Sequence, residues 1–345
     1  MRVKLEDVCE KGSSNLKQSD VAGKSGDYPI FGAAGYIGNV DFYHQDKPYI
    51  AVVKDGAGIG RTSLLPAKSS VIGTMQYLLP KEIVLPEYLC YVVRYMHLEK
   101  YFSGATIPHI YFRDYKNEEF NLDNLDRQQE IVNTLGRIET IIDARKEELS
   151  KLDELIKARF VELFGNPEYN TNGWPTAKLG QLCVVGSSKR IYQNEQSTEG
   201  VPFWRISDLV SKMDTGSVQS SLFIPEERYL ELQQQGLVPE PGDILVTSRG
   251  TLGRCYIITP EDRFYFQDGM ISWLSKYING ITPLYLQYLF EMPGFRKQID
   301  AMQAGSTVAY LSISMLKKME VMIPDVESQV RFATFVDQVD KSKVS

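Results

Sequence analysis

The sequence predicts an α+β protein made of two similar, mainly β domains, which are separated by long helices that form an antiparallel coiled coil. Two observations carry this prediction. The chain repeats itself once over most of its length, and a long segment almost free of glycine and proline separates the two copies. An ordered repeat indicates two copies of one domain type, and apolar positions at heptad spacing are typical of a coiled-coil helix.

The repeat consists of landmarks that occur twice in the same order. Lys4–Ser14 recurs as Lys178–Ser188, with Lys, Leu, Cys, Gly and both Ser matched at an offset of 174 residues. The later landmarks pair Ile59-Gly60-Arg61 with Leu252-Gly253-Arg254, Pro86–Tyr91 with Pro283–Tyr288, and Gly104-Ala105-Thr106 with Gly305-Ser306-Thr307. The offset reaches 201 at the last landmark, so the second copy contains 27 additional residues, most of them around Ser211–Pro241.

Each copy is predicted to be mainly β structure with short helices. The β-branched apolar runs Tyr49–Val53 and Asp243–Thr247 predict buried strands, and a glycine-rich turn follows each of them. Pro86–Tyr101 and Pro283–Ala301 predict helices, because proline is favoured in the first helical turn.

The segment between the copies predicts one long helix. Asp126–Phe164 contains no proline and a single glycine, Gly136. Eight of the ten positions at heptad spacing are apolar: Ile131, Leu135, Ile138, Ile142, Arg145, Leu149, Leu152, Ile156, Arg159 and Leu163. At ~1.5 Å per residue the helix is roughly 58 Å long. Because a small domain is narrower than that, a spacer is favoured over a core helix of one domain.

The C-terminal segment begins the same apolar seam again. At an offset of 201 residues, Phe332, Val336 and Val339 correspond to the first three seam positions, and Gln329 corresponds to Gln128. We therefore expect the two helices to pack as an antiparallel pair that covers both apolar stripes.

The composition limits the class of protein. Hydrophobic residues make up 43% of the chain and charged residues 24%, as in globular proteins. Since the sequence contains neither a bilayer-spanning apolar run nor an apolar signal segment, we expect a cytosolic protein without a membrane partner. The net charge of −6 is unusual for a free DNA-binding protein. Any DNA contact is therefore expected through local patches, with partner subunits supplying more phosphate contacts.

The cysteines and histidines do not indicate a metal site. The four cysteines are widely scattered without a CxxC pair, and the chain has three histidines. Neither a disulfide framework nor a zinc site is predicted from these spacings.

The order of the motifs resembles the specificity subunit of Type I restriction–modification systems. That family has a strand with a Gly-Asp-Ile-Leu start, an Arg-Gly-Thr-like turn, and an apolar-Pro-x-x-x-x-Gln start of the spacer helix. Here the corresponding segments are Pro241–Arg254, Tyr310–Lys317 and Val321–Gln329, and the first copy repeats the helix start as Phe120–Ile131. The resemblance covers nearly the whole chain. One departure is Asp123, which stands in the first copy where the family has proline.

The resemblance implies a DNA-reading subunit without a catalytic site or cofactor of its own. In the family, each target-recognition domain reads one half of a split, asymmetric double-stranded DNA target. The spacer helices set the distance between the halves and bind two methyltransferase subunits, and restriction and translocase subunits join the full complex. On this interpretation residues 1–125 and 165–326 are the recognition domains, 126–164 is the central spacer helix, and 327–345 is a second spacer about half as long.

An adenine methyltransferase is the main alternative. Val53–Gly60 resembles a glycine-rich S-adenosylmethionine loop, and Asn166–Tyr169 resembles the Asn-Pro-Pro-Tyr motif. A cofactor loop leads from a strand into a helix, whereas the strand-like, proline-containing Arg61–Pro66 follows here. The counterpart Ser248–Gly253 lacks the glycine pattern, so a tight turn explains both copies and a cofactor loop explains one. A coiled-coil scaffold that binds no DNA stays open as a third interpretation.

Candidate DNA contacts are side chains on the turns that can donate or accept hydrogen bonds at base edges. The first copy offers Lys54, Arg61, His109 and Arg113. The second copy offers Lys189, Arg190, Tyr192, Ser248, Arg249, Thr251, Arg254, Thr307 and Tyr310. Gly60 and Gly253 are expected to serve the backbone of the turns instead. The sequence predicts no catalytic residue and no metal ligand.

Overall fold

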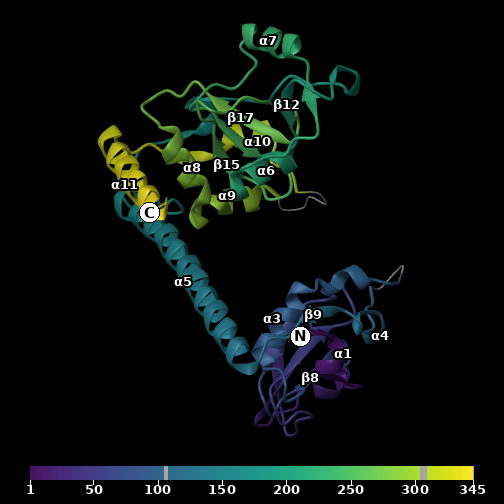
Figure 1. Ribbon diagram of the computed structural model, residues 1–345. Helices are drawn as coiled ribbons and strands as arrows, with labels where there is room; N and C mark the ends of the chain where they lie inside the picture. The colour runs from purple at the N-terminus through teal and green to yellow at the C-terminus, as the bar shows by residue number, and fades with distance from the viewer. Residues whose placement is uncertain (105–107, 304–308, 345) are drawn as a thin grey trace. The chain divides into compact units, whose positions relative to one another are not determined.

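The computed structural model describes residues 1–104, 108–303 and 309–344 (Figure 1). The chain divides into two compact units, Met1–Arg145 and Lys146–Ser345, which are described separately. Both units combine sheets with helices, so the predicted α+β class is confirmed. Among the described helices, none is both long and apolar enough to cross a lipid bilayer.

The first unit is built around a four-stranded antiparallel sheet. Its strands, in spatial order, are β2 (Cys9–Ser13), β8 (Met75–Pro80), β5 (Tyr49–Val53) and β6 (Thr62–Leu65). All five residues of β5 are buried, as its apolar run predicts. Side chains alternate between the two faces of a strand. Ile50 and Val52 pack in the core that contains helix α3, while Tyr49, Ala51 and Val53 pack in a second cluster.

Two smaller ladders and several short helices complete this unit. The ladders are β4 (Gly35–Val40), β3 (Tyr28–Gly32) and β7 (Ser70–Val71), and β1 (Arg2–Lys4) with β9 (Glu119–Asn121). The helices are α1 (Leu5–Val8), α2 (Gln18–Val21), α3 (Pro86–Tyr95), η1 (Leu98–Tyr101) and α4 (Phe112–Tyr115). The single helix predicted for Pro86–Tyr101 is therefore wrong. It is interrupted at His97, whose φ of 52° lies in the left-handed region.

The second unit has the same sheet topology. Its four-stranded sheet has the order β11 (Val184–Gly186), β17 (Ile271–Ser275), β14 (Ile244–Thr247) and β15 (Cys255–Ile257). The ladders are β13 (Phe223–Ile224), β12 (Val201–Trp204) and β16 (Tyr265–Phe266), and β10 (Thr176–Lys178) with β18 (Glu320–Met322). In both units the central strand of the three-stranded sheet has one antiparallel and one parallel neighbour. The predicted duplication therefore extends to strand order and direction.

Helices account for the additional residues of the second copy. Helix α6 (Ile206–Thr215) lies between β12 and β13, and α7 (Glu226–Gln234) lies between β13 and β14. The remaining short helices are η2 (Leu179–Gln181), η3 (Gln193–Glu195), α8 (Pro283–Glu291), α9 (Pro293–Gln303) and α10 (Ile313–Lys318). The helix predicted for Pro283–Ala301 is thus two helices, and the second begins at Pro293, whose ring is unfavourable inside a helix.

Helix α5 (Leu125–Phe164) has 40 residues, close to the predicted bounds, and it begins in one unit and ends in the other. A buried glutamine anchors its first turn. The Gln128 amide oxygen accepts from the backbone N–H of Leu85 at 2.8 Å. The Gln128 amide nitrogen donates to the carbonyl oxygens of Ile83 and Asp123 at 3.0 and 2.8 Å.

The second copy contains the same anchor at the start of helix α11 (Val326–Val344). The Gln329 amide oxygen accepts from the Thr282 backbone N–H at 2.9 Å, and its nitrogen donates to the carbonyls of Gly280 and Pro324 at 3.1 and 3.0 Å. Both glutamines were matched by the sequence repeat. The match therefore reflects an identical hydrogen-bonding role.

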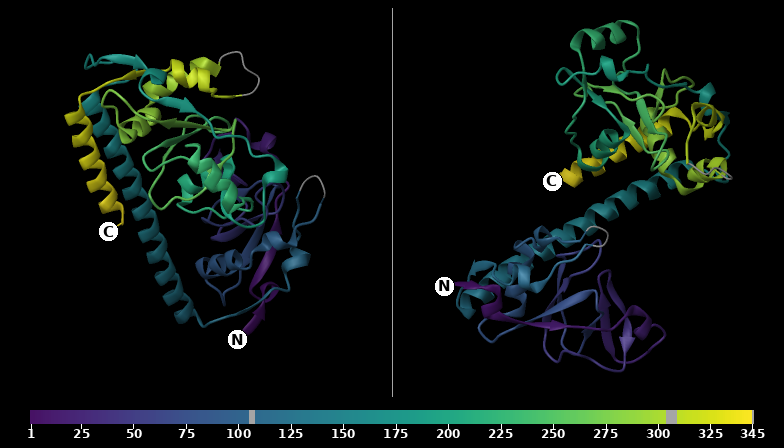
Figure 2. Two further views of the ribbon diagram at one scale, coloured as in Figure 1. Left: turned by 90° about the horizontal axis from the view of Figure 1, so that it is seen from above. Right: turned by 90° about the vertical axis from the view of Figure 1, so that its right-hand side faces the viewer.

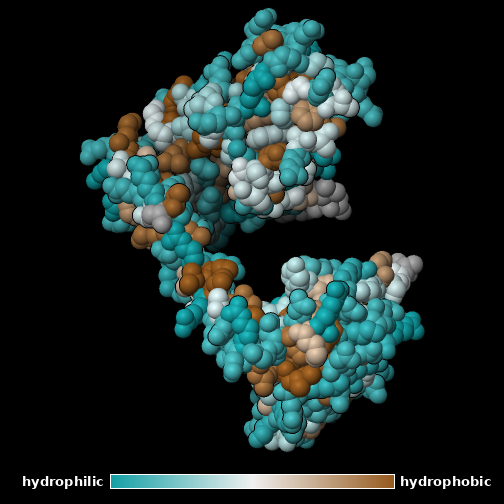
Figure 3. All heavy atoms as spheres, in the orientation of Figure 1, coloured by the Kyte–Doolittle hydropathy of each residue, from teal (hydrophilic) through white to brown (hydrophobic). Residues whose placement is uncertain are grey.

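Helix α11 packs antiparallel against the last part of α5 (Figure 2). The ring centroid of Phe332, near the start of α11, lies 5.4 Å from that of Phe160. Near the other end of α11, Lys343 Nζ lies 2.8 Å from Asp153 Oδ1, which is earlier in α5. The predicted antiparallel pairing of the two seams is confirmed for this part of α5. Earlier in α5 the seam residues Ile138 and Ile142 are exposed, and apolar side chains are visible on this helix in Figure 3.

Candidate nucleic-acid interface

In the first unit the glycine-rich turn connects β5 directly to the antiparallel strand β6. The Val53 N–H donates to the Arg61 carbonyl at 2.9 Å, and the Gly60 N–H donates to the Val53 carbonyl at 2.9 Å. Gly60 has a φ of +81°, and a Cβ there would lie 2.6 Å from the backbone nitrogen of Glu99. The turn therefore requires glycine for its backbone. Because it leads into a strand, it lacks the helix N-terminus with which a cofactor loop binds its ligand.

The second unit repeats this turn between β14 and β15. The Thr247 N–H donates to the Arg254 carbonyl at 2.9 Å, and the Gly253 N–H donates to the Thr247 carbonyl at 2.9 Å. Gly253 has a φ of +71°, and a Cβ there would lie 2.5 Å from Cδ1 of Ile299. The expectation that both glycines serve the backbone agrees with this geometry.

A second segment lies beside the glycine-rich turn in each unit. The Ile110 N–H donates to the Lys54 carbonyl at 2.9 Å, and the equivalent Leu311 N–H donates to the Ser248 carbonyl at 3.0 Å. In the first unit the Gly56 N–H also donates to the Pro108 carbonyl at 2.9 Å. In each unit, described residues of this second segment therefore lie beside the glycine-rich turn, while residues 105–107 and 304–308 lie outside the described residues.

Side chains of the first unit form a polar row on these neighbouring segments. His109 Nδ1 lies 2.6 Å from Asp55 Oδ1. The His109 and Tyr111 rings are stacked with centroids 6.3 Å apart, and the Arg113 guanidinium lies 4.8 Å from the Tyr111 centroid. The Arg113 side chain is 77% exposed. This row combines an acceptor, an imidazole, an aromatic face and a cation.

The corresponding place in the second unit holds a cation on an aromatic ring. The exposed Arg249 guanidinium lies 5.2 Å from the centroid of Tyr310, within the range of a cation–π contact. The Gln303 side chain holds the Tyr310 backbone, because its oxygen accepts from the Tyr310 N–H at 2.8 Å and its nitrogen donates to the Tyr310 carbonyl at 3.1 Å. Thr251 is exposed on the same turn, and Thr307 lies outside the described residues.

The basic–aromatic cluster after β11 lies near the same end of the sheet. Its members Lys189, Arg190 and Tyr192 are exposed. Arg190 pairs with Asp268 at 2.8 Å, just before β17, and the Ser248 N–H donates to the carbonyl of the nearby Met270 at 2.9 Å. This cluster and the glycine-rich turn therefore border one edge of the domain.

A buried tyrosine fixes the backbone of this cluster. The Tyr265 hydroxyl accepts from the Lys189 N–H at 2.8 Å and lies 3.2 Å from the Lys189 carbonyl oxygen, to which it donates. Burial raises the pKa of Tyr265 to about 12. The hydroxyl therefore stays protonated near neutral pH and keeps both bonds.

Two candidates of the second unit are already held by contacts within the protein. Ser248 is 1% exposed and its hydroxyl lies 2.8 Å from that of Ser272, so it faces the interior and we remove it from the candidate surface. Arg254 pairs with Asp214 of α6 at 2.6 Å, and its side chain is 30% exposed. Its counterpart Arg61 instead donates to the Ala33 carbonyl at 3.2 Å. Arg249 is therefore the arginine best presented on this turn.

Sequence reasoning missed Asp55 and Tyr111. Asp55 belongs to the glycine-rich turn whose basic residues Lys54 and Arg61 were the candidates, and Tyr111 lies between the candidates His109 and Arg113. Val53 and Thr247 are equivalent in the repeat. Asp55 and Arg249 each follow by two residues, so they occupy equivalent positions in the two copies. The repeat therefore contained a signal for this position, although the contact with His109 depends on tertiary structure.

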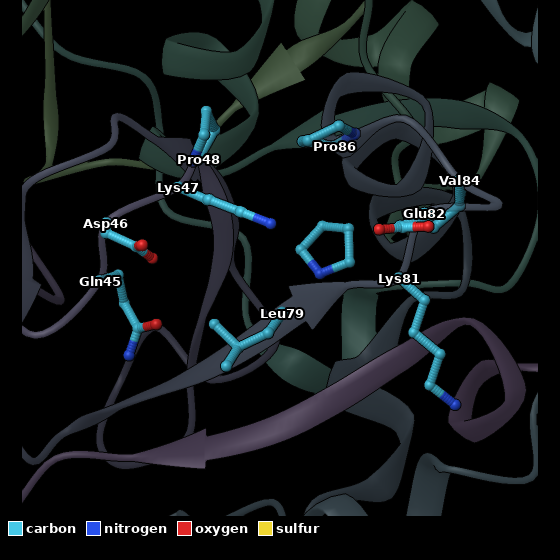
Figure 4. Close-up of a pocket in the computed structure, with 10 residues that line it drawn as sticks. Gln45, Asp46, Lys47, Pro48, Leu79, Lys81, Glu82, Val84 and Pro86 are labelled. Atoms are coloured by element: carbon cyan, nitrogen blue, oxygen red, sulfur yellow. The ribbon is translucent and has the colours of Figure 1, made fainter.

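The cavity in Figure 4 lies elsewhere in the first unit. It has a volume of about 300 Å³ and is bordered by Pro48, just before β5, and by Pro80, the last residue of β8. The glycine-rich turn follows the opposite end of β5. The cavity is therefore separate from the candidate interface. Within the described ranges, no cluster of three or more His, Cys, Asp or Glu side chains is placed to hold a metal ion.

Two copies of one sheet domain, each with polar turns at one edge and a helix that starts at a buried glutamine, define a protein built by internal duplication. The family profile for the Type I restriction modification DNA specificity domain matches residues 1–154 and 171–345. The chain therefore belongs to the family of Type I restriction–modification specificity subunits.

Known relatives are similar over different shares of the chain. A putative type I restriction enzyme specificity subunit of Haemophilus influenzae is 29% identical over 164 residues, which are 47% of this chain and 39% of that protein. Two specificity subunits of Methanocaldococcus jannaschii are 25% and 23% identical, over 72% and 84% of this chain. The chain covers 60% and 72% of those two proteins. It therefore spans well under two thirds of the first of these relatives.

Solved structures show the same fold. The S subunit of a Type I restriction–modification system from M. genitalium aligns with a TM-score of 0.59 at 18% identity, over 99% of this chain and 90% of that one. A chain from a structural study of the assembly and conformational transition of the type I R-M system aligns with a TM-score of 0.52 at 16% identity, over 100% and 90%. These similarities establish the architecture.

Proposed function

We propose that this chain selects the DNA target of a Type I restriction–modification complex, and that each unit reads one half of a bipartite, asymmetric double-stranded site. One observation carries the proposal: an equivalent backbone frame in the two units presents different side chains, Asp55 with His109 in one and Arg249 with Tyr310 in the other. Two readers with one frame and unlike side chains suit a target whose halves differ in sequence.

The helices supply the connection between the two readers in this proposal. Helix α5 is continuous over 40 residues, or roughly 60 Å at ~1.5 Å per residue. We assign the helices two tasks, which are setting the distance between the half-sites and binding two methyltransferase subunits. The exposed seam residues Ile138 and Ile142 support the second task, because apolar side chains of a helix are favourable contacts for a partner. Restriction and translocase subunits join the full complex.

The chain contributes recognition and no chemistry of its own in this proposal. The methyl transfer and its cofactor are assigned to the methyltransferase subunits. The net charge of −6 fits a reader whose partners provide much of the phosphate contact.

The test is methylation mapping of the chain reconstituted with its methyltransferase subunits and S-adenosylmethionine. We expect methylation at one bipartite sequence with unlike halves and a fixed gap. Methylation without a bipartite consensus, or a complex that binds no DNA, would overturn the proposal and favour the scaffold interpretation.

An insertion in α5 tests its role in setting the gap. Four residues added after Ala144, ahead of the pairing between Asp153 and Lys343, lengthen the helix by ~6 Å. At ~3.4 Å per base pair the gap is expected to grow by about two base pairs. Four residues also turn the helix by ~40° beyond a full turn, while two base pairs turn the duplex by ~70°. If the helix runs along the duplex, the two rotations differ by only ~30°.

A seven-residue insertion at the same place is the matched control. It preserves the heptad seam and adds ~10 Å, about three base pairs. The helix then ends ~20° short of two full turns, whereas three base pairs turn the duplex by ~105°. We therefore expect the four-residue variant to methylate a respaced target and the seven-residue variant to do so poorly. If the four-residue variant still methylates only the original spacing, α5 does not set the gap.

A further inference from the structure

We propose that the position two residues after the buried core strand selects a base in each unit: Arg249 selects guanine in one half-site, and Asp55 selects a base with an exposed amino group, cytosine by preference, in the other. This inference rests on the proposed function and deepens it. The positively charged Arg249 is matched to acceptor atoms of a base, and the negatively charged Asp55 is matched to a donor amino group.

The two positions are equivalent by their backbone hydrogen bonds. Val53 and Thr247 each close the glycine-rich turn through the same pair of bonds, and Asp55 and Arg249 follow them by two residues. The intervening Lys54 carbonyl accepts from Ile110, as the carbonyl before Arg249 accepts from Leu311. Asp55 and Arg249 therefore differ in side chain while the backbone around them makes the same hydrogen bonds.

The partners of the two side chains are equivalent as well. His109 and Tyr310 each precede the residue that donates to the glycine-rich turn. The His109 backbone exchanges two hydrogen bonds with the Ser103 backbone at 2.9 and 2.8 Å. The Tyr310 backbone exchanges two with the Gln303 side chain at 2.8 and 3.1 Å. Different groups thus fix the same backbone position, so both partners are held in place.

Arg249 has the properties of a side chain that reads guanine. It is exposed, and the Tyr310 ring supports one face of its planar guanidinium at 5.2 Å. Among the described residues no carboxylate lies within ion-pairing distance of Arg249, whereas Arg190 and Arg254 are paired with aspartates. An arginine fork that is oriented and unpaired can donate two hydrogen bonds to O6 and N7 of guanine.

The negative charge of the Asp55 carboxylate is unsuited to contact with the DNA backbone. A carboxylate is repelled by phosphates, so its place at the proposed DNA-facing edge points to a base contact. Carboxylates accept from the N4 amino group of cytosine. The Asp55 side chain is 30% exposed, and one of its oxygens, Oδ1, lies 2.6 Å from His109. Among the described contacts the other oxygen, Oδ2, has no partner, so it is available to an amino group.

The test uses substitutions with a defined change of base preference, read by methylation mapping of the full complex. Gln and Asn pair with adenine through N6 and N7. We therefore expect Arg249→Gln to change one position of one half-site from guanine to adenine, and Asp55→Asn to favour adenine at one position of the other half-site. The original base should lose preference by about 5- to 150-fold in each case. The unaltered half-site serves as the internal reference for assembly.

Two control variants separate base reading from charge and from stacking. Arg249→Lys keeps the positive charge without the planar fork, so guanine preference should fall while non-specific affinity is retained. Arg263→Gln removes another exposed arginine that lies over a tyrosine, Tyr229, at 5.0 Å. Because Arg263 follows β15 at the end opposite the glycine-rich turn, its substitution should leave the consensus unchanged.

The outcomes separate the inference from the function on which it rests. If the parent complex methylates a bipartite site and Arg249→Gln retains guanine, or weakens all sequences equally, the inference is wrong and the function stands. An Asp55→Asn variant that alters no base preference overturns the assignment for the first unit. If the parent complex shows no bipartite consensus, the proposed function itself is wrong.

Discussion

Gln128→Ala removes the amide that ties the first turn of α5 to the loop before α3. Gln128 is fully buried, at 0% exposure, and it makes three hydrogen bonds to backbone groups of Leu85, Ile83 and Asp123. The alanine variant leaves those groups without this partner. A buried polar group without a partner costs about 1–3 kcal/mol, and some of the three will recover a bond to water. We therefore expect the first unit to lose roughly 3 kcal/mol of unfolding free energy.

The distribution of tryptophans lets the two units be followed separately. All three tryptophans, Trp174, Trp204 and Trp273, lie in the second unit. Tryptophan fluorescence during urea unfolding therefore reports on that unit, while far-ultraviolet circular dichroism reports on both. With a slope of about 2 kcal/mol per molar urea, a loss of 3 kcal/mol lowers the midpoint by roughly 1.5 M. For Gln128→Ala this shift should occur in the dichroism signal and be absent from the fluorescence.

The second copy provides the reciprocal experiment. Gln329→Ala removes three equivalent backbone bonds and a fourth from the Thr282 hydroxyl at 2.9 Å. This variant should lower the fluorescence midpoint by a similar or larger amount.

The matched control is Gln129→Ala, because Gln129 is exposed and bonds only to the Asn133 side chain at 3.0 Å in the described contacts. Its effect should stay within about 0.5 kcal/mol. If Gln128→Ala unfolds like Gln129→Ala, the buried amide does not anchor the helix. If Gln128→Ala shifts the fluorescence as strongly as the dichroism, the two units do not unfold independently.

Two further predictions concern titratable groups. Hydrogen bonds from Lys100 and Tyr101 lower the pKa of Glu118 below its ordinary value, so the carboxylate stabilises the first unit near neutral pH, and this contribution disappears as the pH falls through the folded-state pKa. Glu118→Gln should therefore lower the dichroism midpoint at pH 7 and have little effect at pH 3. Burial raises the pKa of the Cys9 and Cys183 thiols to about 12. At pH 8 both should react with a thiol reagent about a hundredfold or more slowly than in urea, and equal rates would contradict this assignment.

Local patterns predicted the long helix and the core strands because their signals are strong and continuous. The absence of proline over Asp126–Phe164 and the heptad seam located α5 to within one residue at its start. The apolar run Tyr49–Val53 matched β5 at both ends. In both cases most residues favour the same structure, and tertiary contacts add to that preference.

The helix predicted for Pro86–Tyr101 failed because no local signal marks its interruption. His97 has a φ of 52° without a neighbouring glycine or proline. The helix predicted for Pro283–Ala301 does contain such a signal, since Pro293 begins the second helix. Which of the candidate residues contact DNA stays a prediction, and in each unit described residues of the two segments lie side by side. The burial of Ser248 and the pairing of Arg254 with Asp214 depend on contacts between distant segments.

The duplication allows structural and recognition residues to be separated within one sequence. Some pairs keep both residue type and contacts: Tyr88 donates to a backbone carbonyl at 3.0 Å, as Tyr285 does at 3.1 Å, and the buried glutamines make the same bonds in both units. Asp55 and Arg249 occupy equivalent backbone positions yet differ in charge and in contacts. A structural role would constrain both copies alike, because both build the same sheet. A recognition role constrains each copy by its own half-site, so residues that differ on an unchanged frame are where the difference between the half-sites is expected to be encoded.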